Sequence, residues 1–305
     1  MSQPRIVAPY LEPWPALPLA DWLATKDTLH MWTQIVGKIR MALTPPVNHF
    51  WHVTLYVTAA GLTTSPIPYG DSAFEIEFDF LEQRLIIRTA GGLRRSLPLA
   101  PRSVADFYRD LMAALSSLGI QVRIHKLPQE VPSPIPFDQD TTHASYDDEA
   151  AARFWRILLS SDRVFKQFRG RFLGKCSPVH FFWGSFDMAV SRFSGRAAPE
   201  RPGADLITRE AYSHEVISAG FWPGNGGYGE AAFYCYAAPS PAKLAEAKVE
   251  PAAAYFDTKL GEFLLKYNDV RTVSSPDKVV RAFLDSTYAA AANMAGWDRA
   301  ALERH

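Results

Sequence analysis

The chain has 305 residues, of which 48% are hydrophobic and 21% are charged, a composition typical of a globular protein with a buried core. Lysine plus arginine and aspartate plus glutamate each number 32, so no net charge favours nucleic acid or an anionic membrane surface as a partner.

Cysteine content and the N-terminal stretch bear on the cellular compartment. Cys176 and Cys235 are the two cysteines, which is too few for a disulfide framework. The first 20 residues contain five prolines and no apolar run of signal-peptide length, and no run reaches the ~20 residues of a membrane-spanning helix. We therefore expect a soluble cytoplasmic protein.

The first half of the chain is expected to contain helices and an antiparallel meander. Residues 1–18 form a proline-rich arm, and apolar residues then recur at helical spacing until Pro45-Pro46. Alternation of apolar and polar residues predicts the strands, and Ser103 with Asp106 predicts a helix start. The helices cover residues 22–43 and 103–118, and the strands cover residues 47–59, 74–80, 84–89, 93–97 and 120–125.

The predicted meander has a charged outer face. Residues 74–80 place phenylalanines and isoleucine on one side and Glu75, Glu77 and Asp79 on the other. Three arginines on the neighbouring strands are expected to lie across from this acidic face. They are Arg84, Arg88 and Arg94.

Residues 127–146 separate the two halves. They contain four prolines and no apolar period, so they are predicted to be a linker or a long crossing segment. Apolar spacing and turn residues predict further elements in the second half. Helices are predicted over residues 147–171 and 241–247, and a last helix is predicted to begin at the cap residue Ser275. Strands are predicted over residues 179–194, 213–222, 231–237 and 263–267.

The last two strands before residue 241 read as a hairpin with a glycine-rich turn. Gly224, Gly226 and Gly229 match the spacing G-x-G-x-x-G, but this motif binds a dinucleotide only where a helix follows it. Because a strand follows here, the glycines are expected to form the hairpin turn.

Two short stretches resemble each other and suggest an internal repeat. The pattern P-V-x-x-F-W occurs at Pro46–Trp51 and at Pro178–Trp183, each time after a predicted helix. We therefore predict an α+β fold of two pseudo-repeated halves, each an antiparallel sheet with helices packed on one face. The halves are residues 1–126 and 147–305, joined by the linker 127–146.

The repeat also points to a site. The strand face that is apolar in the first copy carries Ser185 and Asp187 in the second. A buried carboxylate is costly unless it is paired, so Asp187 is expected to meet a cation, reach solvent or line a cavity.

Candidate roles follow from residue type and predicted facing. His214 is the candidate acid or base, with Asp187 as its partner and Glu215 as a further catalytic candidate; in each case a hydrogen-bonded or ion-paired sheet residue is the structural alternative. Asp187 and His214 are expected to face one cavity, closed by the turn at residues 223–229. The substrate-binding candidates are His180, Ser185, Arg192, Arg196, Trp222 and Tyr228, with Arg192 or Arg196 as an anion clamp.

Several classes of chemistry lack support. The histidines and cysteines show no metal-ligand spacing, so no metal is predicted, and no flavin, nicotinamide or nucleotide motif indicates a cofactor. Cys176 beside Lys175 is a weak nucleophile candidate.

Residues Tyr212–Val216 (YSHEV) and Gly220–Gly224 (GFWPG), with Val179–Asp187, Arg192–Arg196 and Gly296–Asp298, resemble an uncharacterised bacterial family known as a domain of unknown function. The resemblance spans nearly the whole chain. It implies no activity, cofactor or catalytic residue.

The favoured function is the binding of a small molecule, with acid or base chemistry in a cleft of the second half. The alternative is a non-catalytic binding or assembly protein whose Trp222 and Tyr228 contact a partner. The reaction and the oligomeric state are left open by the sequence.

Overall fold

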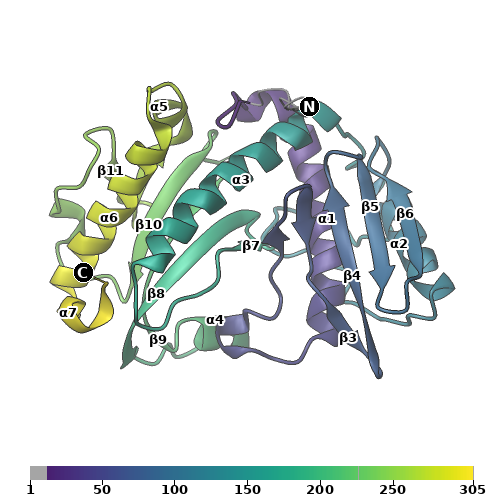
Figure 1. Ribbon diagram of the computed structural model, residues 1–305, viewed down its shortest axis with the longest axis horizontal. Helices are drawn as coiled ribbons and strands as arrows, with labels where there is room; N and C mark the ends of the chain where they lie inside the picture. The colour runs from purple at the N-terminus through teal and green to yellow at the C-terminus, as the bar shows by residue number, and fades with distance from the viewer. Residues whose placement is uncertain (1–11, 226, 305) are drawn as a thin grey trace, which may run out of the picture.

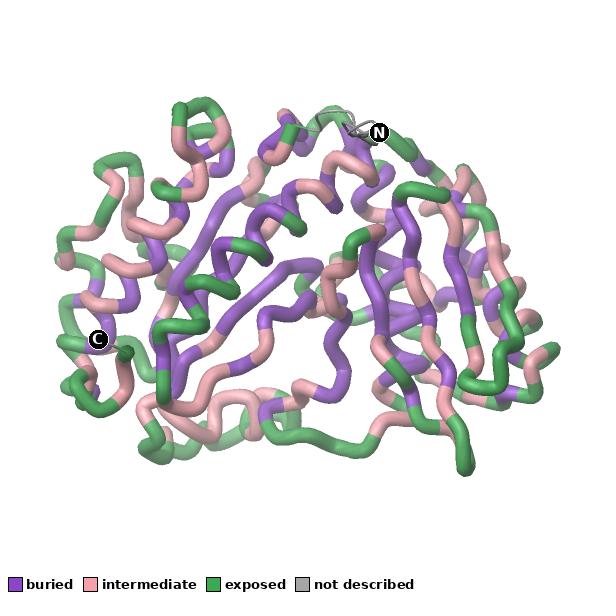
Figure 2. The backbone as a smooth tube through the Cα atoms, in the orientation of Figure 1, coloured by how far each residue is buried: buried purple, intermediate pink, exposed green. Residues whose placement is uncertain are grey.

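Two antiparallel sheets with packed helices make up the computed structural model, which describes residues 12–225 and 227–304 (Figure 1). The predicted α+β class is therefore confirmed. Helix α1 (Leu19–Leu43) runs between the sheets, and its residues from Thr28 to Arg40 are all buried (Figure 2). A helix buried on every side belongs to the core, and one continuous apolar core contains side chains from both sheets.

The first sheet has the order β1-β2-β4-β5-β6, with β3 paired to β4. The buried side chains of β4 include Phe74, Ile76 and Phe78, as the alternation predicts, because every second residue of a strand faces the core. The strands are β1 (Tyr56–Val57), β2 (Gly61–Thr63), β3 (Ile67–Tyr69), β4 (Ser72–Asp79), β5 (Arg84–Thr89) and β6 (Arg94–Pro98).

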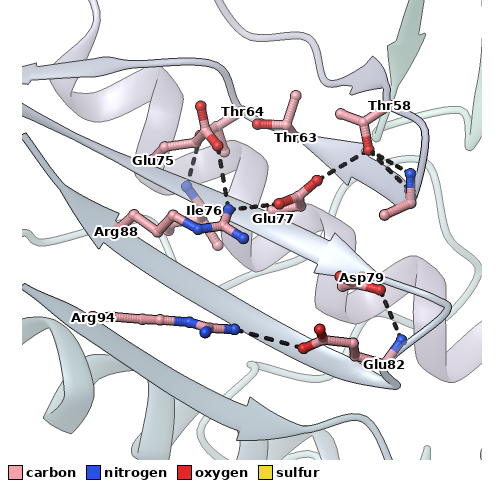
Figure 3. A network of polar contacts seen from close by, with 12 residues as sticks. Thr58, Thr63, Thr64, Glu75, Ile76, Glu77, Asp79, Glu82, Arg88 and Arg94 are labelled. Carbon is pink, nitrogen blue, oxygen red and sulfur yellow. Dashed lines mark hydrogen bonds and ion pairs between the residues drawn. The ribbon is translucent and has the colours of Figure 1, made fainter. Parts of the chain in front are cut away.

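The predicted ion pairs form only in part on this sheet (Figure 3). Arg88 pairs with Glu75 and Glu77 as expected, whereas Arg94 pairs with Glu82 of the following turn and Asp79 accepts from backbone amides. Arg84 departs from the prediction, because its side chain donates to Ser96 Oγ. Exposed pairs contribute only ~0–1 kcal/mol each, so this face is a solvated surface. The pairs are Arg88–Glu77 at 2.6 Å, Arg88–Glu75 at 3.7 Å and Arg94–Glu82 at 3.6 Å.

The predicted strand over residues 47–59 is largely wrong. The chain instead makes a 3-10 turn, η1 (Asn48–Phe50), and only β1 is a strand. His49 and Phe50 both have φ of 59°, a left-handed backbone that cannot continue a strand. Alternation alone did not reveal this turn.

Two other predicted elements do not form. Residues 120–125 have no regular structure, and the Gln121 amide bonds the Tyr69 hydroxyl instead of a neighbouring strand. Residues 241–247 contain only the 3-10 turn η2 (Leu244–Glu246), because Lys243 has φ of 63° and interrupts a longer helix.

The second sheet has the order β11-β12-β10-β9-β8-β7. Helices α3 (Asp148–Gly170) and α6 (Pro276–Met294) pack on one face of it, as Figure 1 shows. The predicted hairpin is confirmed, although Gly226 of its turn lies outside the described residues. The strands are β7 (His180–Phe182), β8 (Asp187–Ala197), β9 (His214–Trp222), β10 (Ala232–Ala238), β11 (Tyr255–Asp257) and β12 (Glu262–Lys266).

The single strand predicted over residues 179–194 is two strands. A turn at residues 183–186 separates β7 from β8, and Phe186 in that turn has φ of 58°. This turn leaves Asp187 at the first position of β8, where it faces the side of the sheet opposite α3 and α6.

The two P-V-x-x-F-W stretches do not occupy equivalent elements. Pro46–Trp51 contains η1, whereas Pro178–Trp183 contains β7, so that part of the repeat prediction is wrong. The two stretches nevertheless meet, because the ring centroids of Trp51 and His180 lie 6.3 Å apart. Just after the first stretch, Leu55 exchanges backbone hydrogen bonds of 2.9 and 2.7 Å with Phe181.

The remaining described segments are short. Residues 1–11 of the proline-rich arm lie outside the described residues, whereas Trp14 is buried against Phe233 with ring centroids 6.1 Å apart. None of the described helices has the length and apolarity needed to cross a membrane. The helices not yet given are α2 (Val104–Ser117), α4 (Leu206–Ala211), α5 (Tyr267–Arg271) and α7 (Arg299–Leu302).

The two predicted serine caps behave differently. Ser103 Oγ accepts a hydrogen bond of 3.0 Å from the Asp106 amide at the start of α2, whereas Ser275 makes no side-chain cap bond to α6. Ser103→Ala is therefore expected to lower the free energy of unfolding by about 1 kcal/mol. Ser275→Ala is the matched control, and urea denaturation that gives both variants the same loss would contradict this account.

Candidate active site

A cavity of ≈ 360 Å³ lies on the face of the second sheet that α3 and α6 leave open. Its floor is formed by strands β7 to β10. Its walls are η1, α4, the turn between β7 and β8, and the segment at residues 129–130. The floor residues are Phe182, Asp187, Ala189, Ser191, Phe193, Val216, Ser218, Tyr234 and Tyr236, and the polar wall residues are His49, Gln129, Glu130, Ser185, Thr208 and Tyr212.

Asp187 is the most deeply buried carboxyl of this cavity, with 7% exposure. The Tyr234 hydroxyl donates a hydrogen bond to Asp187 Oδ2. Tyr234 lies two strands away, and its ring reaches Asp187 across Gly220, which pairs with Tyr234 on one side and with Ala189 on the other. A Cβ at Gly220 would lie 2.4 Å from the Tyr234 hydroxyl, so the glycine makes this contact possible.

The Asp187 carboxyl is set to titrate near neutral pH. Burial raises its pKa to about 7, the Tyr234 hydrogen bond opposes the rise, and the charge of Glu130 adds to it. Burial also raises the pKa of Glu262 on β12 to about 7, and the charge of Asp187 contributes. The Tyr234 pKa is raised far above its usual value, so Tyr234 keeps its proton and remains the donor. A carboxyl in this range can give or take a proton at neutral pH.

Glu130 brings a second carboxylate to the same end of the cavity. It accepts a hydrogen bond of 2.7 Å from Ser185 Oγ. A Cβ at Gly184 would lie 2.8 Å from Glu130 Oε1, so this glycine allows the close approach. Glu130 therefore adds negative charge beside Asp187.

Helix α1 holds the segment that carries Glu130. Gln34 donates 2.8 Å to the Gln129 carbonyl and accepts 2.9 Å from the Gln129 amide. Lys38 donates 2.8 Å to the Leu127 carbonyl. The buried Gln34 and Lys38 side chains thus find their hydrogen-bond partners in the backbone of residues 127–129. These bonds hold part of the predicted linker in place as a wall of the cavity.

The opposite end of the cavity contains His49. Its Nδ1 lies 3.1 Å from the carbonyl oxygens of both Glu210 and Ala211, and Lys175 Nζ lies 2.6 Å from Nε2. The ammonium is a donor, so Nε2 accepts and the proton lies on Nδ1. Burial and the Lys175 charge lower the His49 pKa. His49 is therefore neutral at neutral pH.

Strained backbone is concentrated around this cavity. Among the described non-glycine residues, eight have positive φ, and three of them, His49, Phe50 and Glu130, line the cavity. Phe186 is a fourth and lies between two lining residues. Such conformations cost on the order of 1–3 kcal/mol each and collect at functional sites. The strain therefore supports a functional interpretation of the cavity.

The prediction that His214 shares a cavity with Asp187 is wrong. His214 pairs with Ala197 at one end of the β8–β9 ladder, while Met188, next to Asp187, pairs with Phe221 at the other. This places them roughly 25 Å apart along the strands. His214 instead lies beside His49, with ring centroids 5.8 Å apart. Neither His214 nor the described residues of the turn, 223–225 and 227–229, line the cavity.

Three charged candidates lie on the other face of the sheet. Glu215 accepts hydrogen bonds from Ser194, at 2.9 Å, and from Arg196, at 2.7 Å. Arg192 is buried, donates to the Phe168 carbonyl and lies over the Tyr288 ring, 4.2 Å from its centroid. None of the three lines the cavity, so the predicted anion clamp does not form there.

Of the other substrate-binding candidates, Ser185 lines the cavity and the rest do not. His180 is fully buried, and burial lowers its pKa to about 3. Trp222 and Tyr228 pack on each other with ring centroids 5.7 Å apart, and the Tyr228 hydroxyl lies 2.7 Å from that of Tyr255. The Trp222 and Tyr228 rings are half-buried because they pack on each other. This packing weakens the alternative function, in which these two residues form an exposed surface that contacts a partner.

Metal and thiol chemistry find little support in residues 12–225 and 227–304. No group of three or more potential metal ligands gathers in this part of the chain. Burial raises the Cys176 pKa to about 11, so its thiol is protonated at neutral pH and is a poor nucleophile.

Four members of the site were not predicted from the sequence. They are Glu130, His49, Tyr234 and Tyr236. The alternation of the β10 strand already placed Tyr234 and Tyr236 on one face, which was the available signal. Glu130 and His49 lie in segments whose conformation the local sequence did not indicate.

Comparison with known proteins yields a family without an assigned activity. No curated protein and no solved structure matches the chain significantly. A family model does match, over residues 14–304, and this covers nearly the whole chain. The chain therefore belongs to the DUF5996 family, which is described as a family of unknown function.

Proposed function

We propose that this protein binds a small organic molecule in the cavity above the second sheet and that the Asp187 carboxyl exchanges a proton with it. The observation that carries the proposal is a buried carboxyl, lining a cavity, whose pKa is raised to about 7. Perturbed carboxyls in concave sites are typical of acid–base catalysis.

The hydrogen bonding of Asp187 supports this role. Oδ2 accepts from Tyr234, and among the described residues no side chain donates to Oδ1. Oδ1 is not one of the fully buried side-chain atoms that lack a partner, so it borders the cavity. Oδ1 is therefore the atom that a bound molecule would contact, as proton donor to the carboxylate or as acceptor from the carboxylic acid.

Size and lining support a small ligand. The volume of ≈ 360 Å³ falls at the lower end of the ~300–1,000 Å³ typical of small-molecule sites. Near the middle of the floor, Ser191 Oγ and Ser218 Oγ lie 2.9 Å apart, and the hydroxyls of Tyr212 and Tyr236 lie 3.0 Å apart. These hydroxyls add donors and acceptors between the two ends of the cavity.

The test is mass spectrometry of the small molecules that are released when protein purified from its native cells is denatured. The parent and a Glu215→Gln control, changed on the other face of the sheet, are expected to release the same compound. Asp187→Asn and Ile207→Trp, which narrows the cavity from the exposed side of α4, are expected to release at least about tenfold less. Equal release from all four proteins would contradict the proposal.

A further inference from the structure

The charges that line the cavity are negative. Asp187 and Glu130 are its two carboxyl-bearing lining residues, and the part of the chain that the structure describes contributes no lysine or arginine to the lining. His49 is the basic side chain of the lining, and burial and Lys175 lower its pKa. The nearby Lys175 ammonium bonds His49 Nε2 at the opposite end of the cavity, so an anionic ligand beside Asp187 and Glu130 would meet like charge.

Aromatic rings make up much of the remaining lining. They include Trp51, Phe182, Trp183, Phe193, Tyr234 and Tyr236. The faces of such rings attract cations. The protein itself shows this, because Lys175 Nζ lies 5.6 Å from the Trp51 centroid and 5.3 Å from the Phe193 centroid.

We propose that the ligand is a small organic amine, protonated at neutral pH, whose ammonium group lies between the Asp187 carboxylate and the aromatic rings and can exchange a proton with that carboxylate. This inference rests on the proposed function and names its ligand class. Burial of a cation without a partner is costly, and Asp187 with Glu130 supplies that partner. The rings surround the rest of the molecule.

Binding of a cation is expected to depend on pH through Asp187. The groups that face Asp187 are Tyr234 from β10, Glu130 from the 127–146 segment and the charge of Glu262 from β12. His30 of α1, which bonds the Gly184 carbonyl at 2.8 Å, is held neutral because burial lowers its pKa to about 4. A cation favours the ionised carboxyl, so binding below pH 7 releases a proton, and affinity falls about tenfold per pH unit there.

Calorimetric titration tests the inference with three probes of similar size that differ in charge. They are benzylamine, which is a cation, benzyl alcohol, which is neutral, and benzoate, which is an anion. At pH 8, benzylamine is expected to bind at least about tenfold more tightly than the alcohol, and benzoate is expected not to bind. Asp187→Asn and, to a smaller extent, Glu130→Gln are expected to weaken benzylamine binding, while Glu215→Gln leaves it unchanged.

The outcomes separate the two proposals. If the alcohol or benzoate binds as tightly as benzylamine and Asp187→Asn abolishes that binding, the ligand class is wrong and the proposed function stands. If benzylamine binds with the same affinity to Asp187→Asn, or does not bind at millimolar concentration, the inference is overturned. If none of the probes shifts the Asp187 titration, the inference about the ligand class fails, and the release of a native compound from the parent but not from Asp187→Asn decides separately whether the proposed function stands.

Discussion

The Asp187→Asn variant is expected to be more stable than the parent protein at pH 8 by on the order of 3 kcal/mol, and nearly equal to it at pH 4.5. Asparagine is isosteric with aspartate, and its carbonyl oxygen can still accept the Tyr234 hydrogen bond. It lacks the charge that must be buried at high pH. The variant therefore loses a functional carboxyl and gains stability, as substitutions at functional sites often do.

The pH dependence has a definite sign. The Asp187 pKa in the folded protein is about 7, above the value of about 4 for an unfolded chain. Between these two values the folded state holds a proton that the unfolded state has released. The parent therefore loses stability as pH rises from about 4 to 7, and the loss is complete above pH 7.

Thermal or urea unfolding of both proteins across this range measures the difference. The difference cancels the contributions of His30 and His180, which both proteins share, and it includes the part of the Glu262 shift that the Asp187 charge causes. A constant gap between the two curves, or a variant less stable than the parent at pH 8, would show that Asp187 is stabilised as an ion and that its pKa is not raised.

Gly220→Ala is expected to lower the free energy of unfolding by roughly 1–3 kcal/mol. The added Cβ would lie 2.4 Å from the Met188 carbonyl oxygen and 2.4 Å from the Tyr234 hydroxyl. The carbonyl belongs to a paired strand and cannot move freely, so the first clash strains the pairing of β8 with β9, and the second clash displaces the Tyr234 ring. The hydrogen bond to Asp187 is then lost, and because that bond lowers the Asp187 pKa, the pKa is expected to rise further.

Gly184→Ala is the matched control for this substitution. Its Cβ would meet Glu130 Oε1 at 2.8 Å, which is the end of a flexible side chain. A smaller loss of stability, measured by urea denaturation, is expected. Equal losses in the two variants would show that the approach of Tyr234 over Gly220 does not restrict the site.

The sequence predicted those parts of the fold in which local pattern and tertiary environment agree. Alternation located β4 and β5, and the hairpin of β9 and β10 followed from two alternating runs around glycines. Prediction failed at Phe50 and Phe186, because both have a left-handed backbone although neither is a glycine or an asparagine, the residues that usually indicate it. The same sequence pattern, P-V-x-x-F-W, therefore forms a turn at Pro46–Trp51 and a strand at Pro178–Trp183.

Only some residues of the candidate site could be predicted from the sequence pattern. Asp187 and Ser185 stood out because polar residues occupied a face expected to be apolar. The pairing of Asp187 with Tyr234 depends on the order and register of three strands, which no local pattern specifies. Glu130 lies in a segment that lacks periodicity, and its position is set by the buried polar side chains of α1, Gln34 and Lys38.

The most direct test is a ¹³C NMR titration of the Asp187 carboxyl carbon, assigned by its absence from the Asp187→Asn spectrum. We expect a midpoint near pH 7 for the free protein, since burial raises the pKa to about 7, and a lower midpoint in saturating benzylamine. A midpoint near the ordinary value of about 4, unchanged by any of the probes, would contradict the assignment of Asp187 as the proton-exchanging group of a ligand site.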